Sequence, residues 1–269
     1  MMRADAAVNA ENASAPLRTA RIRVPIAPMH AEPRVASPQI SQQLAGHLVD
    51  VLVSEGDWVR ATGVDGYPGW MHAGYLVPIP PHTTRRSQGA PWVSLGCTTE
   101  GVDETRRSLP LRAMLSHDER VVDGEAMDPL QISRRFPPSG AAIAMTARRY
   151  FGGTSYQWGG VTPWGADCSG MVQAVFALHG IPLPRDAWQQ AEHGATMRGA
   201  LSDVQAGDLL FFSDREDRRV THVGIAAGPN RLMHLSLGRG GFAIERFDDS
   251  GDAVTAALRA RFLFTKRLV

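Results

Sequence analysis

One cysteine and two histidines in this chain have the types and spacing that nucleophilic catalysis requires. Cys168 follows the glycine-rich segment WGGVTPWGAD and begins a stretch with apolar residues at helical spacing, so we expect it in the first turn of a helix. The first amides of a helix have no intrahelical partner and carry partial positive charge. They are predicted to lower the pKa of the thiol, to favour the nucleophilic thiolate and to hold an oxyanion.

His222 and His234 lie on either side of a predicted turn. The segment THVGIAAGPNRLMHLSL has the pattern of a β-hairpin with AAGPNR as its turn. If the turn is centred near Gly228, the two histidines pair across the hairpin on one face, with Cβ atoms roughly 5 Å apart. One imidazole would then accept the thiol proton while the other orients the first ring, as in nucleophilic catalysis.

The same residues also allow interpretations without catalysis. Cysteine is often buried, and position alone supports a structural Cys168 about as well as a nucleophile. Each histidine taken singly is a common polar residue of a half-exposed sheet. One cysteine and two histidines could bind zinc, but their spacing matches no standard zinc pattern, so no metal is predicted. Cys97, in SLGCTTE, has no evident base and is interpreted as structural.

The elements around Cys168 are predicted to be helices followed by strands. Residues 168–179 carry an apolar stripe that ends at Gly180 and Pro182, which are typical helix-stop residues. AAIAMTARRYFGG predicts an earlier helix, and DLLFF, THVGIAA and RLMHLSL predict strands. The C-terminal part is therefore expected to be α+β, with an antiparallel sheet after the helices.

The region before these helices has the strand–turn rhythm of small β-barrels. Val49, Val51 and Val53 alternate, and EGD and DGYPG break the pattern as turns. A second, less regular region contains APWVSLG, LPLRAML and ERVVDGE as strand-like pieces. The predicted organisation is an N-terminal tail at 1–30, a first β-module at 31–80, a second at 81–137 and an α+β domain at 138–269.

Composition limits the classes of partner. The net charge of +1 gives no electrostatic argument for binding nucleic acid or a membrane surface. Two cysteines argue against a disulfide framework, and no apolar stretch is long enough to span a membrane. The start lacks the apolar core of a secretory signal, so a cytoplasmic location is expected, or a secreted or periplasmic one if the start has been trimmed.

Six motifs in order carry a family resemblance. YQWGG, ADCSG, PRDA, GDLLFF, THVGI and MHLS, over roughly 140–269, resemble the NlpC/p60-type cysteine peptidases, which are bacterial relatives of papain. GDWV and GYPGW resemble bacterial SH3-type domains. The implied fold is α+β and multidomain, with two small SH3-like barrels followed by a papain-like catalytic domain. This arrangement resembles the γ-D-glutamyl-L-diamino acid endopeptidases that recycle murein peptides.

The resemblance implies roles for individual residues. Cys168 matches the family nucleophile, His222 the general base and His234 the residue that orients it. Tyr156 matches a tyrosine whose hydroxyl lies beside the nucleophile. The implied substrate-binding positions are Tyr156, Trp158, Asp167, Ser169, Asp186 and Tyr67. Trp158 also fits a core aromatic, which is the more common role of such residues.

Recognition of the free amino end of the substrate is where this sequence departs from the family. Asp167 matches a carboxylate that helps to bind this end, although an aspartate at a helix start is also a common N-cap. Ala187 stands where related enzymes can have a serine. The first β-module is expected to supply a tyrosine, Tyr67 or Tyr75. It is also expected to supply an acidic residue, but SPQISQQLAG contains none and Glu32 is merely nearby.

The predicted function is therefore hydrolysis of the γ-D-glutamyl–L-diamino acid bond in short murein peptides with a free N-terminal L-alanine. The partner is this peptide substrate, and no organic cofactor is expected. Two alternatives stay open, a secreted hydrolase of intact peptidoglycan and a non-catalytic protein that binds wall peptides. The sequence leaves open the choice between diaminopimelate and lysine, as well as the oligomeric state.

Overall fold

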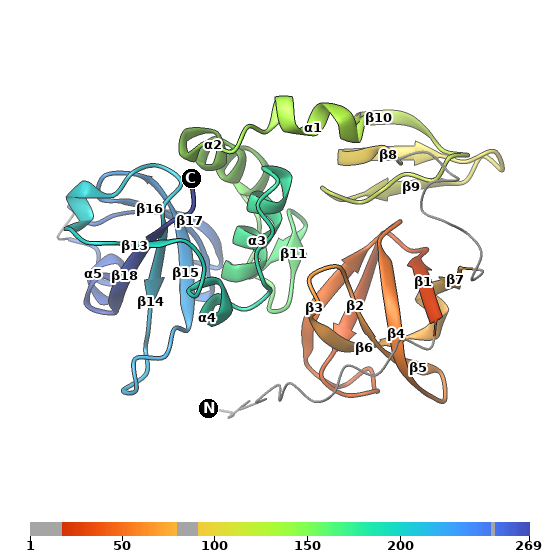
Figure 1. Ribbon diagram of the computed structural model, residues 1–269, viewed down its shortest axis with the longest axis horizontal. Helices are drawn as coiled ribbons and strands as arrows, with labels where there is room; N and C mark the ends of the chain where they lie inside the picture. Colours follow the sequence, from red (N-terminus) through yellow and green to blue (C-terminus); the bar gives the residue numbers. More distant parts are fainter. Residues whose placement is uncertain (1–17, 80–90, 249–250) are drawn as a thin grey trace.

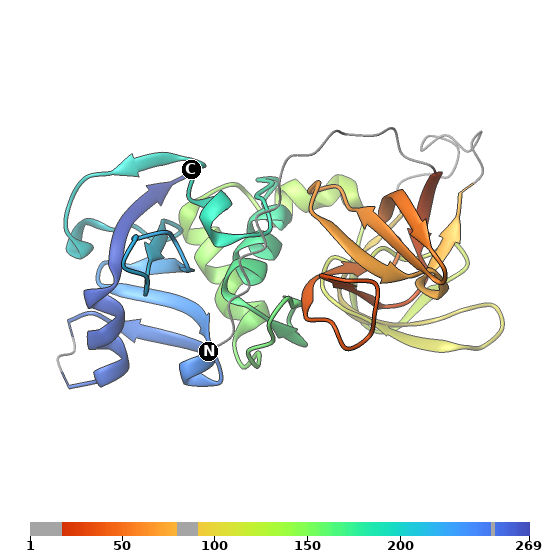
Figure 2. The same cartoon turned by 90° about the horizontal axis from the view of Figure 1, so that it is seen from below.

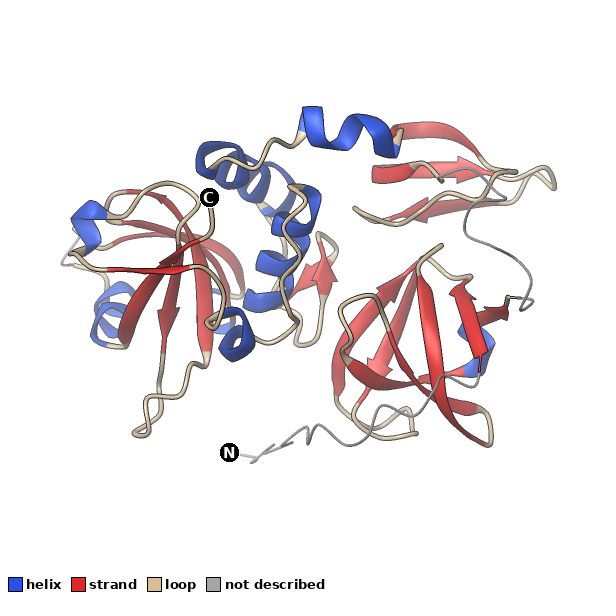
Figure 3. Cartoon of the chain, in the orientation of Figure 1, coloured by secondary structure: helices blue, strands red, loops and turns tan. Residues whose placement is uncertain are grey.

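The computed structural model describes residues 18–79, 91–248 and 251–269. A seven-stranded sheet, a three-stranded sheet and a mixed region of helices and sheet follow one another along the chain (Figure 1). Two views show the long helices of the C-terminal region between its own large sheet and the two N-terminal sheets (Figures 2 and 3). Among the described helices, none is long and apolar enough to cross a membrane.

The first sheet is antiparallel, and its strands alternate buried and exposed residues as the sequence pattern predicts. Val49 and Val51 are buried against Val59, Ala61 and Met71. Its strands lie in the order β3-β2-β6-β5-β4-β1-β7. They are β1 (Arg18–Ile22), β2 (Ile26–His30), β3 (Gln39–Leu44), β4 (Leu48–Glu55), β5 (Trp58–Thr62), β6 (Pro68–His72) and β7 (Leu76–Pro78), with the 3-10 turn η1 (Ala73–Tyr75) before β7.

The expected tail at 1–30 is wrong for its second half. Strands β1 and β2 lie within it, and their alternate apolar side chains, Ala20, Ile22, Ala27 and Met29, are buried in the first core. The intervening arginines and prolines concealed this alternation in the sequence. Residues 1–17 lie outside the described part of the chain. Closure into an SH3-like barrel is not confirmed, because β3 and β7 are the two edges of the sheet.

The second β-module is a three-stranded sheet rather than the expected barrel. It contains β8 (Val93–Glu100), β9 (Arg106–Leu109) and β10 (Arg120–Met127), in the order β10-β8-β9. Most of the strand-like piece LPLRAML is not a strand, since β9 ends at Leu109. Leu95 and Leu111 are buried in the C-terminal core, and Cys97 shares a second core with Leu44 of the first sheet. The module therefore packs into both neighbours.

The C-terminal region is α+β, as the pattern predicted. Its helices are α1 (Pro129–Arg135), α2 (Gly140–Phe151), α3 (Cys168–Leu178), α4 (Ala187–Gln190) and α5 (Ala253–Ala260). Its strands are β11 (Val161–Thr162), β12 (Gly165–Ala166), β13 (Ala195–Met197), β14 (Leu209–Phe212), β15 (His222–Gly228), β16 (Arg231–Ser236), β17 (Gly241–Arg246) and β18 (Phe262–Arg267), with 3-10 turns η2 (Leu201–Asp203) and η3 (Leu237–Arg239). The six-stranded order is β13-β18-β14-β15-β16-β17.

The two faces of the six-stranded sheet have separate cores. Val223 and Ile225 of β15 pack with Met171 and Val175 of α3 on one face. The other face, with Leu210 and Phe212, packs against Leu258 of α5. Helix α3 is thereby fixed against the middle of the sheet, with its first residue near the beginning of β15.

Candidate active site

Cys168 is the first residue of α3, as the sequence predicted. The Oδ1 atom of Asp167, the N-cap, accepts a hydrogen bond from Gly170 N at 2.8 Å. Gly170 is required because a Cβ there would collide with the carbonyl oxygen of Gly160 in the preceding loop. The backbone amides of Ser169 and Val223 lie near the Cys168 sulfur and favour its ionised form. The thiol therefore lies between the start of α3 and the start of β15.

The expected low thiol pKa is not found. Burial raises the pKa of Cys168 to about 12, and the adjacent Asp167 charge acts in the same direction. The two amides oppose this shift but do not overcome it, because the side chain is only 8% exposed. The cysteine of the free protein is a neutral thiol, and its activation requires a base.

His222 and His234 are hydrogen-bonded to each other. The His222 Nε2 atom lies 2.8 Å from His234 Nδ1, and the two rings are nearly perpendicular, with centroids 5.0 Å apart. The sequence predicted that the two residues lie directly opposite each other, and the structure shows that they do not. Ile225 pairs with Met233, which places His234 opposite Gly224.

The difference in register arises from the turn. The chain reverses at Pro229 and Asn230, and Asn230 adopts the positive φ of 56° that a tight hairpin turn needs. This shifts the pairing by two residues, which keeps both histidines on the same face of the sheet. The rings meet diagonally, and Gly224 leaves room beside His234, because a Cβ at Gly224 would lie 3.0 Å from the His234 Cβ.

His222 is a neutral imidazole in the free protein. Burial lowers its pKa to about 3, and the neighbouring His234 and Arg261 act in the same direction. Within the described residues, no hydrogen bond joins the Cys168 thiol to either ring. The thiol instead contacts the amide of Val223, the residue after His222. Catalytic hydrogen bonds in apo enzymes often tighten only when substrate binds.

Asp167 is fully engaged within the protein. The Oδ2 atom lies 2.6 Å from Arg185 Nη2 and accepts from Gly159 N, while Oδ1 accepts from Ser169 Oγ and Arg185 Nη1. The Arg185 side chain is 2% exposed and also donates to Ser41 Oγ of β3. Asp167 thus serves as N-cap and as partner of a buried arginine, and the structure offers no free carboxylate there for a substrate amine.

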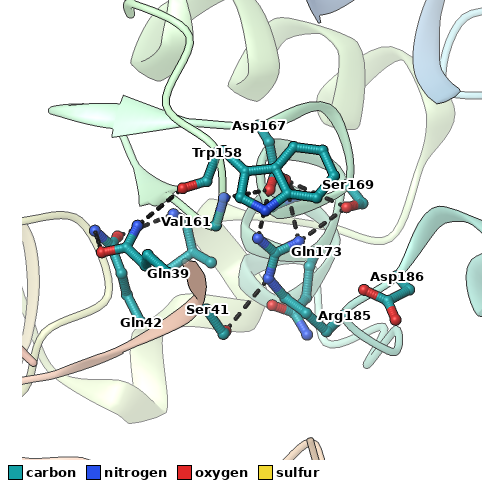
Figure 4. A network of polar contacts seen from close by, with 12 residues as sticks. Gln39, Ser41, Gln42, Trp158, Val161, Asp167, Ser169, Gln173, Arg185 and Asp186 are labelled. Carbon is teal, nitrogen blue, oxygen red and sulfur yellow. Dashed lines mark hydrogen bonds and ion pairs between the residues drawn. The ribbon is translucent and has the colours of Figure 1, made fainter. Parts of the chain in front are cut away.

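The first sheet closes one side of this site (Figure 4). Gln39 Nε2 donates to the backbone oxygen of Trp158 at 3.0 Å, and Val161 N donates to Gln42 Oε1 at 3.1 Å. Gln173 of α3 donates to Asp65 Oδ2 at 3.0 Å. These contacts hold the first sheet against the beginning of α3.

Tyr67 and Asp186 meet across the same interface. The Tyr67 hydroxyl lies near the Asp186 carboxylate; burial, followed by this negative charge, raises the pKa of Tyr67. Burial also raises the pKa of Asp186. Tyr75 instead contacts His72 within the first sheet, so Tyr67 is the tyrosine that faces the site. Glu32 pairs with Arg34 on the exposed surface and takes no part.

The remaining residues singled out in the sequence lie in different surroundings. Tyr156 lies near the thiol, since burial and then the charges of Cys168 and Asp167 raise the pKa of its hydroxyl. Trp158 is 65% exposed and is therefore no core residue. Cys97 is buried and donates to Ser94 Oγ, as its structural interpretation expected. Among the residues that the structure covers, no three His, Cys, Asp or Glu side chains gather as a metal site.

Two important residues were missed from the sequence, Arg185 and Glu245. Glu245 of β17 lies behind the histidines, with Oε1 3.1 Å from His234 Nε2. Only weak features of the sequence pointed to these two residues. Arg185 stands in the PRDA motif, and Glu245 is an acidic residue within the strand-like segment FAIERF that follows MHLS.

Comparisons relate this chain to known proteins. Residues 153–254 match the model of the NlpC/P60 family. A γ-D-glutamyl-L-lysine dipeptidyl-peptidase of Bacillus subtilis is 32% identical over 214 residues, which cover 72% of this chain and 71% of the relative. A protein of the same description from Bacillus cereus is 27% identical over 224 residues, covering 72% and 66%.

A solved structure shares the fold. The crystal structure of an NlpC/P60 family protein from Bacillus cereus superposes with a TM-score of 0.73, at 20% sequence identity, over 93% of this chain and 99% of that one. An NlpC/P60 endopeptidase from Photobacterium damselae gives 0.65 at 15% identity, over 92% of this chain and 70% of that one. At these identities the likeness concerns the fold alone.

Proposed function

Because this chain belongs to the NlpC/P60 family of cysteine peptidases, we propose that it hydrolyses the γ-D-glutamyl–L-diamino acid bond of short murein peptides with a free N-terminal L-alanine. The observation that carries the proposal is the wall of first-sheet residues beside the helix start, Ser41, Asp65 and Tyr67. A wall at this position limits how far a substrate can extend beyond its amino end.

The proposed chemistry starts with the thiol of Cys168. As the sulfur attacks the γ-carbonyl of D-glutamate, its proton passes to His222, and the backbone amide of Ser169 at the helix start stabilises the oxyanion. The protonated His222 then donates to the leaving amine of the diamino acid. Water, with His222 as base, hydrolyses the thioester and releases L-Ala–γ-D-Glu and the free thiol. His234 orients the His222 ring in both steps.

The Asp186–Tyr67 pair is the proposed receptor for the substrate ammonium. Asp186 is half-buried and close to Arg185, and no ion pair within the described residues occupies its carboxylate. We do not assign this role to Asp167, because it pairs directly with Arg185. An ammonium held at a fixed place relative to Cys168 would select the second peptide bond, which is the behaviour of a dipeptidyl-peptidase.

Purified protein assayed on three substrates tests the proposal. These are L-Ala–γ-D-Glu–diaminopimelate, the same peptide acetylated at its amino end, and intact peptidoglycan, with a lysine-containing tripeptide to measure the preference at the leaving side. Cleavage of the free tripeptides alone supports the proposal. Cleavage of intact wall would favour a secreted hydrolase, and cleavage of none would favour a binding protein. Recycling of short peptides implies a cytoplasmic site of action, which fractionation of cells tests.

A further inference from the structure

A buried carboxylate extends the hydrogen-bonded chain that begins at His222. The chain crosses three adjacent strands, from His222 on β15 to His234 on β16, 2.8 Å apart, and then to Glu245 on β17 at 3.1 Å. His234 is 1% exposed and Glu245 is 3% exposed, so water does not substitute for these contacts. A buried carboxylate placed by chance would be costly, which points to a role for this one.

Glu245 is held from behind by two further side chains. Arg239 of η3 donates to both of its oxygens, at 2.8 Å and 2.7 Å, and Thr255 of α5 donates to Oε2 at 2.6 Å. Although burial opposes ionisation, the hydrogen bonds from Arg239, His234 and Thr255 hold the pKa of Glu245 well below its usual range. Glu245 is therefore an ionised group that accepts hydrogen bonds and donates none.

Because Glu245 at the end of this row of hydrogen bonds can only accept, it determines which nitrogen of each histidine carries a proton. His234 must carry its proton on Nε2 to donate to Glu245, which leaves Nδ1 of a neutral His234 as an acceptor. His222 must then donate through Nε2, which leaves its own Nδ1 with a free lone pair. We propose that Glu245 is a positioning residue that sets the tautomers of both histidines and thereby makes His222 Nδ1 the basic nitrogen. This inference rests on the proposed function.

Glu245 also supplies charge. With Arg239 it forms a cluster that includes Asp252, the second carboxylate paired with this arginine. Two carboxylates and one guanidinium leave one surplus negative charge. That charge lies two hydrogen bonds from His222 and opposes the positive charge of Arg261, which disfavours the imidazolium form that catalysis requires.

The test removes the negative charge of Glu245 and keeps the shape of its side chain. Glu245→Gln is compared with Glu55→Gln, a matched substitution on an exposed position of β4 in the first sheet. We expect Glu245→Gln to lower kcat roughly 10–100-fold with little change in KM, as loss of an outer orienting group does elsewhere. Both limbs of its pH–rate profile should move to lower pH, because removal of a negative charge makes each proton easier to release. The control should match the wild type.

A measurement independent of activity separates this inference from the proposed function. Nitrogen-15 NMR of the imidazole rings, assigned through His222→Gln and His234→Gln, should show protonated Nε2 on both histidines of the wild type near neutral pH. Protonated Nδ1 on either ring would overturn the inference even if the enzyme is active, without any need for the Glu245 variant to fold. Unshifted pH limbs in a folded Glu245→Gln protein would overturn it as well.

Discussion

Two arginine–carboxylate pairs adjoin the candidate site, one beside Cys168 and one behind the histidines, and they differ in what else the carboxylate contacts. Asp167 pairs with Arg185, whose side chain is 2% exposed, and its remaining contacts go to backbone amides and Ser169. Glu245 pairs with Arg239, which is 30% exposed, and Oε1 of Glu245 also accepts a hydrogen bond from His234. The first pair holds the helix start and the interface together. The second pair acts on the histidines.

The difference shows that an ion pair alone does not identify a role. The acceptor positions that remain after the arginine is satisfied decide whether a carboxylate supports the fold or the chemistry. The comparison yields four tests, from the largest expected effect to the smallest.

The largest effect is expected at the thiol itself, which adjoins Asp167 on one side and the His222–Val223 peptide on the other. Cys168→Ala should lower turnover of the free tripeptide by at least about 10⁴-fold, because it removes the nucleophile and leaves no substitute. Thermal unfolding should change little. Cys97→Ala is the matched control, since it alters a buried cysteine outside the site and should keep kcat. Appreciable turnover by the Cys168 variant would refute the assignment.

The two arginines should separate stability from catalysis. Arg185→Met leaves Asp167 buried without its partner and should reduce the free energy of unfolding by roughly 3–5 kcal/mol. Arg239→Met likewise leaves a buried carboxylate, Glu245 at 3% exposure, without its arginine, and should in addition lower kcat more per unit of stability lost than Arg185→Met. Urea unfolding and steady-state kinetics on both variants measure this. The same ratio of lost kcat to lost stability in both variants would contradict the comparison.

The histidine side of the site should make the protein sensitive to acid. The pKa of His222 is near 6.5 in the unfolded chain and about 3 in the folded one, so the unfolded state binds the proton first as pH falls. The contribution of His222 to the free energy of unfolding is therefore fully present above about pH 6.5. It decreases below that pH, with a slope approaching about 1.4 kcal/mol per pH unit.

Urea unfolding between pH 4 and pH 7 measures that slope. His222→Gln should flatten the curve, whereas His193→Gln, at an exposed position, should leave it unchanged. A curve of wild-type slope in His222→Gln would show that other groups carry the acid sensitivity.

The smallest effect is expected at the amine receptor. Tyr67→Phe removes the polar hydroxyl near Asp186 and should raise KM for the free tripeptide about three- to tenfold, with less effect on kcat. Tyr75→Phe serves as the control because Tyr75 lies within the first sheet. Selectivity against the acetylated peptide should fall in Tyr67→Phe alone. If Tyr75→Phe shows the same loss, the receptor has been placed wrongly.

Local features of the site were predictable from the sequence, and long-range features were not. The position of Cys168 and the shared face of the two histidines follow from patterns a few residues long. The predicted hairpin register was wrong by two residues, because the register depends on the conformation of Asn230. Arg185 and Glu245 were missed because their partners are brought to them by tertiary packing. The pKa of Cys168 was mispredicted because its burial is not visible in its local sequence.

The three-stranded sheet has a consequence for how the molecule unfolds and how it could be rearranged. Leu95 and Leu111 belong to the core beneath α3, while Cys97 and Leu109 share a core with Leu44 of the first sheet and Val161 near the site. Removing this sheet would expose both cores to water. The chain is therefore expected to melt in a single cooperative transition rather than piece by piece, and its catalytic part is a poor candidate for transplantation without the sheets that precede it.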